Sequence, residues 1–517
     1  MKAREGYLIG LDIGTTNTKA VAFDPARRRV VAVSAHPTPY STGGDDRPSE
    51  IDPEALWLGV TRVLREVTAA SAGPAAAVGI ASMAEAGVPL DERGRPLYRI
   101  IPWYDVRTEP QLQRVLREHD PIRLFRITGQ APRHVYTLYK ILWLREHAPD
   151  VFRSLHRWLS ISDYVAWRLA GVAATDYSLA SRTMFFDQRT RSWSAEMLAI
   201  AGLRADQLPE ARPAGTIVGT VTAEAAAATG LPAGLPVAIG GHDHLCGAVG
   251  AGAIEPGQVV DSIGTAEGMV IPTTAYRDDD LFRQKRICIY AHVLADQYIV
   301  QAGMALSGGA LSWIADRLFA DAPDPVAAAL TAAATAPAGA ERLLYFPYLG
   351  GNGSPVGDEN VAGAFIGLRA PHERSHLVRA VLEGVAFAVR HSLEVVEQVI
   401  GRVPDPIRVI GGGGRSPLWL QIRADVLGRV LLGVEVPEAV ALGAALLAGV
   451  GAGVFPDVPT AAAAVDRAVT AYEPDPTRHA LYDRRFHDSY LQLYPALAPI
   501  FTALASEESV TLPAAGA

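Results

Sequence analysis

The feature that most constrains the fold is a short pattern that occurs twice, 250 residues apart (263 minus 13). An apolar run at 7–11 leads into a polar turn that contains Ile13-Gly14-Thr15, and a second apolar run follows at 20–23. The same succession surrounds Ile263-Gly264-Thr265. Each copy is typical of a β-hairpin around a turn that contains glycine. Because a solenoid repeats every ~20–50 residues, an offset of this length predicts one duplicated domain instead.

The rest of the chain predicts an α/β fold. A length of 517 residues is too great for one ordinary domain, and an apolar content of 49% is enough for large cores. Expected helices alternate with short apolar segments, in the order 53–70, 77–81, 138–146, 236–239 and 408–410. Small residues and a Glu-Pro-Gly turn break this pattern at 250–257. We therefore expect an N-terminal domain over 1–252, a C-terminal domain over 253–500 and a tail over 501–517.

Charge and cysteine content limit the classes of partner. The chain has 47 basic and 55 acidic residues, a net charge of −8, and neither sign gathers into runs. Nucleic acid and membrane surfaces are therefore not expected as partners, and a small molecule is. Asp12 interrupts the first apolar run before any cleavage site, so we expect no signal peptide. Two cysteines, Cys246 and Cys288, cannot build a disulfide framework, which favours a cytoplasmic location.

A long uncharged stretch at 439–455 is rich in glycine and alanine. It falls short of the ~20 strongly apolar residues that a bilayer requires. We expect it to form a buried helix.

The first turn carries groups that can bind a phosphate. Its backbone amides, hydroxyls and one ammonium belong to Gly14, Thr15, Thr16, Asn17 and Lys19. Asp12, one step before the turn, could hold a hydrated Mg²⁺. An ordinary hairpin turn with a capping aspartate would look the same, so both interpretations stay open. The turn is not a Walker loop, because that motif is absent.

Glycines cluster where a strand is expected to pass into a helix. Gly411 and Gly412 follow the segment 408–410, and Ser416 precedes an expected helix at 418–427. Glycines at such a turn let a phosphate approach the helix N-terminus. A tight turn without a ligand is the alternative. Gly308, which opens another expected helix, gives a similar but weaker signal.

Asp243 comes directly after the apolar segment 236–239. Active sites of open α/β sheets lie at such strand ends, so Asp243 is a candidate general base toward a hydroxyl group. His242 and His244 on either side raise the alternative of a metal site. We expect that three consecutive residues cannot readily converge on one ion, which disfavours a metal hydrolase.

A candidate pocket for a polyhydroxyl ligand lies earlier in the chain. Glu85 follows the segment 77–81 in apolar surroundings, where a carboxylate needs a partner. Trp103, Asp105 and Arg107 place an aromatic face, an acceptor and a donor close together. A surface turn with an ion pair between Asp105 and Arg107 would have the same sequence, so both interpretations stay open.

Taken in order, these segments resemble the FGGY carbohydrate kinases of the actin-like ATPase superfamily, over nearly the whole chain to about residue 500. The resemblance implies two duplicated actin-like (ribonuclease H-like) domains with an interdomain cleft that closes on ATP. The turn from Asp12 to Lys19 is similar to the first phosphate motif of the family, and Gly264-Thr265 to the second. Gly411, Gly412 and Ser416 fall in its adenosine motif, and Gly308 fits a position near the adenine.

The resemblance also implies ATP- and Mg²⁺-dependent phosphorylation of a sugar or polyol, with a ketose such as xylulose favoured. Asp243 matches the catalytic aspartate, and Asp12 would hold Mg²⁺ through water. The expected substrate-binding residues are Glu85, Trp103, Asp105, Arg107 and His244. Similar kinases are often dimers, so the resemblance allows a homodimer.

Two alternatives remain open at this point. Where glycerol kinases carry Arg-Glu and xylulose kinases Met-His, this chain has Ala84-Glu85. A glycerol- or erythritol-type polyol kinase is therefore one alternative. A non-kinase actin-like ATPase is another, from a different class of protein.

Overall fold

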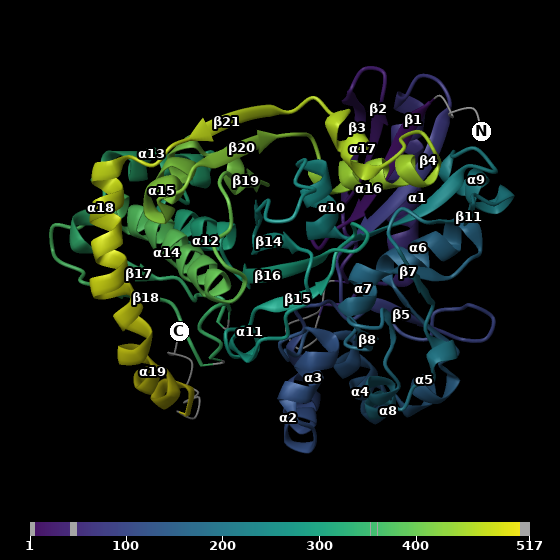
Figure 1. Cartoon of the computed structure of the whole chain (residues 1–517), viewed down its shortest axis with the longest axis horizontal. Coiled ribbons are helices and arrows are strands. Elements are labelled where there is room, and N and C mark those ends of the chain that lie inside the picture. Colours follow the sequence, from purple (N-terminus) through teal and green to yellow (C-terminus); the bar gives the residue numbers. More distant parts are fainter. Residues whose placement is uncertain (1–5, 42–48, 352, 359, 507–517) are drawn as a thin grey trace, which may run out of the picture. The chain divides into compact units, whose positions relative to one another are not determined.

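The computed structural model describes residues 6–41, 49–351, 353–358 and 360–506 (Figure 1). The chain divides into two compact units. Unit 1 comprises Met1–Ser262, Val270–Gln301 and Val434–Val469, and unit 2 comprises Ile263–Met269, Ala302–Gly433 and Thr470–Ala517. Each unit thus contains segments that are far apart in the sequence, and the boundary at residue 252 stays a prediction.

Unit 1 is built on a six-stranded sheet. Its strand order is β11 (Ile217–Thr220), β12 (Pro236–His242), β4 (Ala75–Ser82), β1 (Tyr7–Ile13), β2 (Asn17–Asp24) and β3 (Arg29–Pro37). Strands β1 and β2 are antiparallel neighbours, which confirms the first predicted hairpin. Strands β1, β4 and β12 run parallel, so their carboxyl ends meet at one edge of the sheet.

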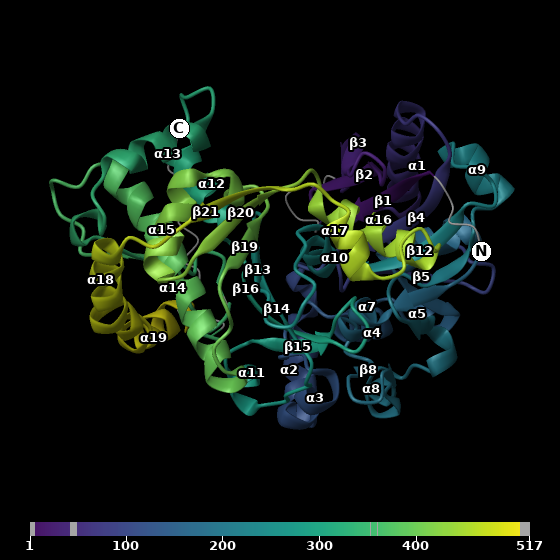
Figure 2. The same cartoon turned by 45° about the horizontal axis from the view of Figure 1, so that its top comes forward.

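Helices cover both faces of this sheet. Alternate residues of β1 point to opposite faces, as the pleat of a strand requires. Ile9 belongs to a core that includes α1 (Pro53–Ala70) and α6 (Ile161–Ala170). Leu8 belongs to a second core that includes α10 (Asp243–Gly250) and α16 (Ala439–Gly451). Helices α10 and α16 lie side by side in both views (Figures 1 and 2).

Glycines explain why α16 belongs to unit 1 although it lies late in the sequence. A Cβ atom on Gly10 of β1 would lie 1.7 Å from the carbonyl oxygen of Ala441, and one on Gly79 of β4 would lie 2.1 Å from that of Ala444. The backbone of α16 therefore rests directly on the sheet, at a separation that only glycine permits. The predicted buried helix is confirmed at 439–451.

The remaining elements of unit 1 surround this sheet. The short strands are β5 (Gly87–Leu90), β6 (Arg157–Ser160), β7 (Ala174–Asp176), β8 (Phe186–Asp187), β9 (Ser192–Trp193), β10 (Glu210–Arg212) and β15 (Cys288–Ala291). The helices are η1 (Val106–Thr108), α2 (Glu109–Glu118), α3 (Pro121–Thr128), α4 (Thr137–His147), α5 (Pro149–Ser154), α7 (Tyr177–Ser181), α8 (Ala195–Ala201), η2 (Ala205–Gln207), α9 (Ala223–Thr229), α11 (Asp280–Gln284) and α17 (Val458–Ala463).

Five strands contain residues of both units: β13 (Val260–Ile263), β14 (Glu267–Thr273), β16 (Tyr298–Met304), β20 (Leu431–Glu435) and β21 (Ala468–Tyr472). In unit 2, β19 (Ile407–Ile410) runs parallel to β20, and β17 (Leu344–Phe346) pairs antiparallel with β18 (Ala364–Ile366). Its helices are α12 (Gly308–Leu318), α13 (Pro325–Thr335), η3 (Ala340–Arg342), α14 (Arg374–Ile400), η4 (Gly413–Arg415), α15 (Pro417–Leu427), α18 (Pro476–Arg485), η5 (Phe486–Tyr490) and α19 (Leu491–Ser506).

The predicted alternation of helices and strands is confirmed. Helices α1, α4 and α15 and strands β4, β12 and β19 lie where the sequence predicts them. The predicted tail begins inside α19, and residues 507–517 lie outside the described part of the chain. Among the described residues, none of the helices combines the length and apolar character that crossing a bilayer requires.

Candidate active site

The carboxyl edge of the unit 1 sheet brings three predicted segments together. Ser82 of β4 pairs with Ile13 of β1 on one side and with His242 of β12 on the other. The residues that follow these strands therefore emerge at the same edge, where ligands of open α/β sheets bind. They include the first phosphate turn, Glu85 and Asp243.

The first turn is held by its own backbone. The N–H of Gly14 donates to the oxygen of Asn17 at 3.0 Å, and Oγ1 of Thr38 donates to the oxygen of Gly14 at 2.7 Å. Thr16 is exposed. Lys19 stands opposite Asp12 in the hairpin, and its Nζ lies 2.6 Å from Oε2 of Glu438. The cation that the sequence offers to a phosphate is thus already paired.

Asp12 carries a buried oxygen without a hydrogen-bond partner among the described residues. Its carboxylate is buried, and among the described residues Oδ1 finds no hydrogen-bond donor. Burial raises the pKa of Asp12 well above its usual range, and the negative charge of Asp243 adds to this effect. A divalent cation would satisfy a buried, unpaired carboxylate, so the site fits the Mg²⁺ that the sequence predicts.

Asp243 is the first residue of α10. Its Oδ1 accepts a hydrogen bond from the backbone N–H of His244 at 2.7 Å and lies 3.2 Å from Nε2 of His242. Burial raises the pKa of Asp243, and the charge of His244 opposes that shift. A carboxylate with a raised pKa is a stronger acceptor for a proton, as a general base requires.

The three consecutive residues His242, Asp243 and His244 come closer together than the sequence argument allowed. One potential ligand atom from each lies within 4.8 Å of the others, because the chain turns here from strand β12 into helix α10. The expectation that they cannot converge is therefore too strict. Both ring nitrogens of His242 already face partners, however: Nδ1 lies 3.0 Å from the hydroxyl of Tyr290, and Nε2 faces Asp243. A metal ion would have to displace the contact between His242 and Asp243.

Glu85 is buried and has the partner that its surroundings demand. Nε of Arg182 donates to Oε1 of Glu85 at 2.7 Å, and Nη2 donates to the same oxygen. Nη1 of Arg182 donates to Oε1 of Gln130 at 2.7 Å. The guanidinium also lies 5.0 Å from the ring centre of Tyr136 and 5.2 Å from that of Tyr290. Glu85 itself has a φ of +65°, a strained conformation of the kind that often occurs at functional sites.

Sequence reasoning missed Arg182, Gln130 and Tyr290, which belong to segments without a recognisable motif. The sequence does contain one indication that Arg182 has a buried partner. Arg182 lies just before the apolar run 184–186, and a charged residue beside such a run often has a buried partner.

Trp103 and the pair Asp105 and Arg107 have different surroundings. Nε1 of Trp103 donates to Oγ1 of Thr15 at 2.9 Å, so this ring contacts the first phosphate turn. Nη2 of Arg107 lies 2.8 Å from Oδ2 of Asp105, and its Nη1 lies 2.7 Å from Oε1 of Glu50. The ion pair that the sequence left as an alternative therefore exists, and its charges are bonded to one another.

Lys140 is a further buried charge that the sequence analysis overlooked. Its Nζ donates to the carbonyl oxygen of Val135. Burial lowers the pKa of Lys140 to about 8, and the charges of Glu85 and Asp105 oppose that shift. Lys140 thus adds positive charge to the region that contains the carboxylates of Glu85 and Asp105.

The second phosphate turn belongs to unit 2. The N–H of Gly264 donates to the oxygen of Ala266 at 2.9 Å, and the N–H of Gly308 donates to the oxygen of Gly264 at 3.1 Å. A Cβ atom on Gly308 would lie 2.3 Å from that oxygen. The backbone oxygen of Thr265 accepts from the N–H of Ser307 at 2.9 Å. Gly308 is therefore required for the contact between this turn and the start of α12.

The glycines after β19 have unequal roles. Gly411 has a φ of +89°, and a Cβ atom there would lie 2.5 Å from the oxygen of Ile263. Gly412 has φ −61° and ψ −44°, and a Cβ atom there would meet no described atom within 4 Å. Ser416 caps α15 by accepting from the N–H of Trp419 at 3.3 Å. The fold requires glycine at 411 but leaves the space beside Gly412 free for a ligand.

Comparison with known proteins identifies the family. The N-terminal domain of the FGGY family of carbohydrate kinases matches residues 7–250, and its C-terminal domain matches residues 261–452. The chain belongs to the FGGY family of carbohydrate kinases. The two matches also establish the α/β fold with two actin-like domains. As a member of this family the protein is a carbohydrate kinase, which implies the use of ATP and a sugar.

Three relatives illustrate the range of the family. A xylulose kinase of Bacillus subtilis (strain 168) is 30% identical over 504 residues, which cover 97% of this chain and 99% of that protein. A gluconokinase of Bacillus licheniformis is 29% identical over 455 residues, which cover 85% of this chain and 86% of that protein. The crystal structure of a xylulose kinase from Rhodospirillum rubrum has a TM-score of 0.87 and 33% identity, with 96% of this chain and 100% of that one covered.

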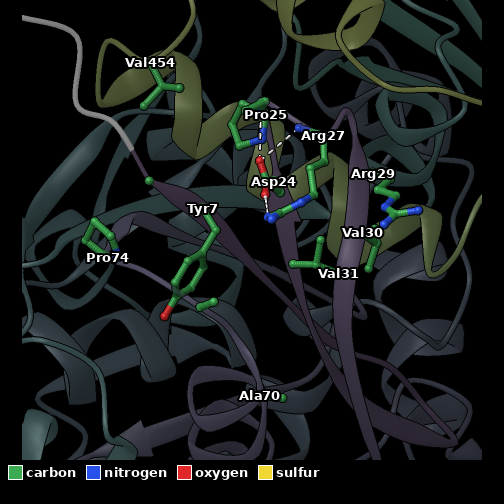
Figure 3. Close-up of a pocket in the computed structure, with 13 residues that line it drawn as sticks. Tyr7, Asp24, Pro25, Arg27, Arg29, Val30, Val31, Ala70, Pro74 and Val454 are labelled. Carbon is green, nitrogen blue, oxygen red and sulfur yellow. Dashed lines mark hydrogen bonds and ion pairs between the residues drawn. The ribbon is translucent and has the colours of Figure 1, made fainter.

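The kinase also has a pocket away from this edge (Figure 3). It is lined by residues that include Tyr7, Asp24, Arg27 and Val31. Tyr7 is the first residue of β1, whereas Asp12 is the last but one. The pocket therefore lies at the opposite end of the strand and is separate from the candidate site.

Proposed function

We propose that this kinase transfers the γ-phosphoryl group of ATP to a hydroxyl group of an uncharged ketose such as xylulose. The observation that carries the proposal is the position of Asp243 at the same sheet edge as Glu85. The similarity to xylulose kinases over nearly the whole chain supports the choice of sugar.

The side chains of this chain have distinct tasks in the proposed reaction. Asp243 takes the proton of the attacking hydroxyl, and the bond between Oδ1 and the N–H of His244 fixes the carboxylate for that transfer. Asp12 would hold Mg²⁺ through water, and the bound ion would neutralise charge on the phosphates. Glu85, held by Arg182, orients the sugar by accepting hydrogen bonds from its hydroxyl groups.

The nucleotide would be bound through backbone N–H groups, hydroxyl groups and the side chains of Asn17 and Lys19. Their donors belong to the two phosphate turns and to the glycine turn after β19. The residues concerned are Gly14, Thr15, Thr16, Asn17, Lys19, Gly264, Thr265, Gly308, Gly411, Gly412 and Ser416. Backbone N–H groups suit this task because they point at a phosphate without adding a mobile side chain.

The gluconokinase relatives make an aldonate the second candidate acceptor. An aldonate brings a carboxylate, which would need a cation in the pocket. Two buried cations lie in this region: Arg182 donates two hydrogen bonds to Glu85 and one to Gln130, and Lys140 donates to the carbonyl oxygen of Val135. Asp12, Asp243 and Glu85 add negative charge to the same edge. This balance favours an uncharged sugar.

A coupled assay of ATP consumption with a panel of pentuloses, hexuloses, aldonates and polyols tests the proposal. We expect turnover to depend on the added acceptor and a ketopentose to give the highest kcat/KM. A polyol or an aldonate as the best acceptor would contradict the substrate assignment. ATP consumption that is equally fast without any acceptor would favour a non-kinase ATPase.

The proposal extends to location and assembly. Both cysteines, Cys246 and Cys288, are buried free thiols, and ATP is a cytoplasmic substrate, which together support a cytoplasmic location. A homodimer is the assembly proposed from the family resemblance. Light scattering on the purified protein tests it, and a mass of 54.9 kDa would show a monomer instead.

A further inference from the structure

A chain of polar contacts leads from Asp243 into the interior of unit 1, through three side chains that the proposed reaction does not use. Nε2 of His242 lies 3.2 Å from Oδ1 of Asp243. Nδ1 of His242 lies 3.0 Å from the hydroxyl oxygen of Tyr290. That hydroxyl donates to Oε1 of Gln301 at 2.6 Å. His242 and Tyr290 are buried, so water does not compete for these contacts.

The surroundings of His242 fix its protonation. Burial lowers the pKa of His242 well below its usual range, and the charges of His244 and Arg182 act in the same direction. The ring is therefore neutral, and one of its nitrogens donates while the other accepts. Since the proton of the Tyr290 hydroxyl goes to Gln301, the hydroxyl oxygen accepts from Nδ1 of His242. Nε2 then presents a lone pair to Asp243.

A lone pair on Nε2 and a carboxylate oxygen bond to each other only when a proton lies between them. In the proposed reaction such a proton arrives when Asp243 takes it from the sugar hydroxyl. The O–H bond of the sugar breaks as an O–H bond on Asp243 forms, either on Oδ1 or on the other oxygen, followed by a half-turn of the carboxyl group. The proton stays on Asp243 until product leaves and then passes to water.

Resting on the proposed function, we propose that His242 is a positioning residue: its Nε2 accepts a hydrogen bond from Asp243 once that residue carries the substrate proton, and Tyr290 and Gln301 fix the tautomer that makes this bond. His242 would therefore strengthen Asp243 as a base without touching substrate. This role of His242 requires its contacts with both Asp243 and Tyr290 and the bond from Tyr290 to Gln301. Without the Tyr290 hydroxyl, the imidazole could adopt the other tautomer.

Other ionisable groups also face Asp243, and their effect on its pKa is the same in the enzyme and in a variant of His242. They are Asp12 from β1, Glu85 after β4, Arg182 after α7, Tyr290 from β15, and His244 and Cys246 from α10. The charge of Glu85 raises the pKa of Asp243, whereas those of His244 and Arg182 lower it. A variant of His242 leaves these groups in place, so a shift in the pH profile reports the bond to Nε2.

The variant His242→Asn keeps a donor near the Nδ1 position and removes Nε2. We expect kcat on the best sugar to fall about tenfold, the worth of one strong hydrogen bond, with KM for sugar and ATP nearly unchanged. The acid limb of the kcat profile should move to lower pH by about one unit, because the protonated form of Asp243 loses its acceptor. Tyr290→Phe should move it in the same direction.

Tyr139→Phe is the matched control. Tyr139 is a buried tyrosine of unit 1 whose hydroxyl has no hydrogen-bond partner among the described residues. The pH profile of kcat for Tyr139→Phe should coincide with that of the unaltered enzyme. An acid limb that stays in place, or moves to higher pH, in Tyr290→Phe would overturn the proposal, and this gentler variant decides if His242→Asn fails to fold.

A second readout does not depend on activity. NMR of the full chain with ¹⁵N-labelled histidine reports which ring nitrogen carries the proton, and the His242 signals are those lost in His242→Asn or, if that variant does not fold, those shifted in Tyr290→Phe. We expect the proton on Nδ1. A proton on Nε2 would overturn the proposal. If the enzyme phosphorylates no sugar at all, the proposed function fails, and the NMR result still decides the tautomer.

Discussion

Arg182 donates two hydrogen bonds to one carboxylate oxygen of Glu85, although 97 residues of the chain separate them. Only 8% of Arg182 and 7% of Glu85 are exposed. Two charges that are buried together stabilise a fold only as a pair, because either one alone would be uncompensated. This contact therefore fixes the carboxylate of Glu85, the candidate sugar-binding group. It also determines how a substitution of Glu85 will affect stability.

The first prediction concerns this pair. Glu85→Gln should raise KM for the sugar or change the sugar preference, with KM for ATP unchanged, because the amide keeps the shape and loses the charge. It should also lower the free energy of unfolding by about 3 kcal/mol, because Arg182 remains charged and buried. The double variant Glu85→Gln with Arg182→Met should recover stability but not sugar affinity. Urea denaturation and steady-state kinetics measure the two effects; unaltered sugar kinetics in Glu85→Gln would remove Glu85 from the pocket.

The second prediction uses two neighbouring glycines of unit 2. Gly412→Val should weaken ATP binding about tenfold or more without lowering the melting temperature, because the added side chain occupies space that the fold leaves open. Gly411→Val is the comparison. It should lower the melting temperature, because position 411 has a positive φ and a Cβ atom there would approach Ile263. Calorimetric titration with ATP and with sugar separates the effects, and unchanged ATP binding in Gly412→Val would make the turn purely structural.

The third prediction is a pH dependence of stability. Burial raises the pKa of Asp163 to about 8, far above the value of 3.8 expected in the unfolded chain. Between these two values the native state binds a proton that the unfolded state does not, so this group's contribution to stability falls as the pH rises. Asp163→Asn should gain stability relative to the unaltered protein by at most about 1.4 kcal/mol per pH unit, up to about pH 8.

Asp176→Asn is the control for this effect. Burial raises the pKa of Asp176 to about 6, so its relative gain should end about there. Urea denaturation between about pH 5 and pH 9 tests both variants, because this range includes the pKa values of both carboxyl groups. A difference between Asp163→Asn and the unaltered protein that does not depend on pH would mean that Asp163 is ionised in the native state.

The fourth prediction tests the packing of α16 on the sheet. Gly10→Ala should lower the free energy of unfolding by about 3 kcal/mol or more, because its Cβ atom would overlap the backbone of α16. Gly59→Ala, within α1, is the control: no described atom lies within 4 Å of its Cβ position, so a gain of up to about 1 kcal/mol is expected. Equal stability of the two variants would contradict the direct contact between helix and sheet.

The sequence was informative where the signal is local. Apolar runs on either side of the polar turn at Gly14 predict the hairpin, and an apolar strand that stops at a polar residue predicts where Asp243 emerges. The sequence also shows that 439–455 is apolar enough to be buried. It could not show that this helix packs on Gly10, because the two segments are more than 400 residues apart. In the sequence, a close contact between backbones is marked only by a glycine, and a glycine does not identify the contacting segment.

The partners of the candidate site residues were less predictable. Arg182 beside Glu85 and Glu438 beside Lys19 are tertiary contacts, and neither has a local pattern that names its partner. For Asp105 and Arg107 the spacing was compatible with a sugar pocket and with an ion pair. The structure contains the ion pair and adds Glu50 to it, a residue that the spacing could not reveal.

The most direct test of the account is the activity of Asp243→Asn on the best sugar of the panel, measured as sugar phosphate formed per active site. The amide keeps the shape of the side chain but cannot take the hydroxyl proton. We predict a fall in kcat of at least about a hundredfold, the usual contribution of a general base, with ATP binding and melting temperature nearly unchanged. A kcat within about threefold of the unaltered enzyme would contradict the role of Asp243 as the base.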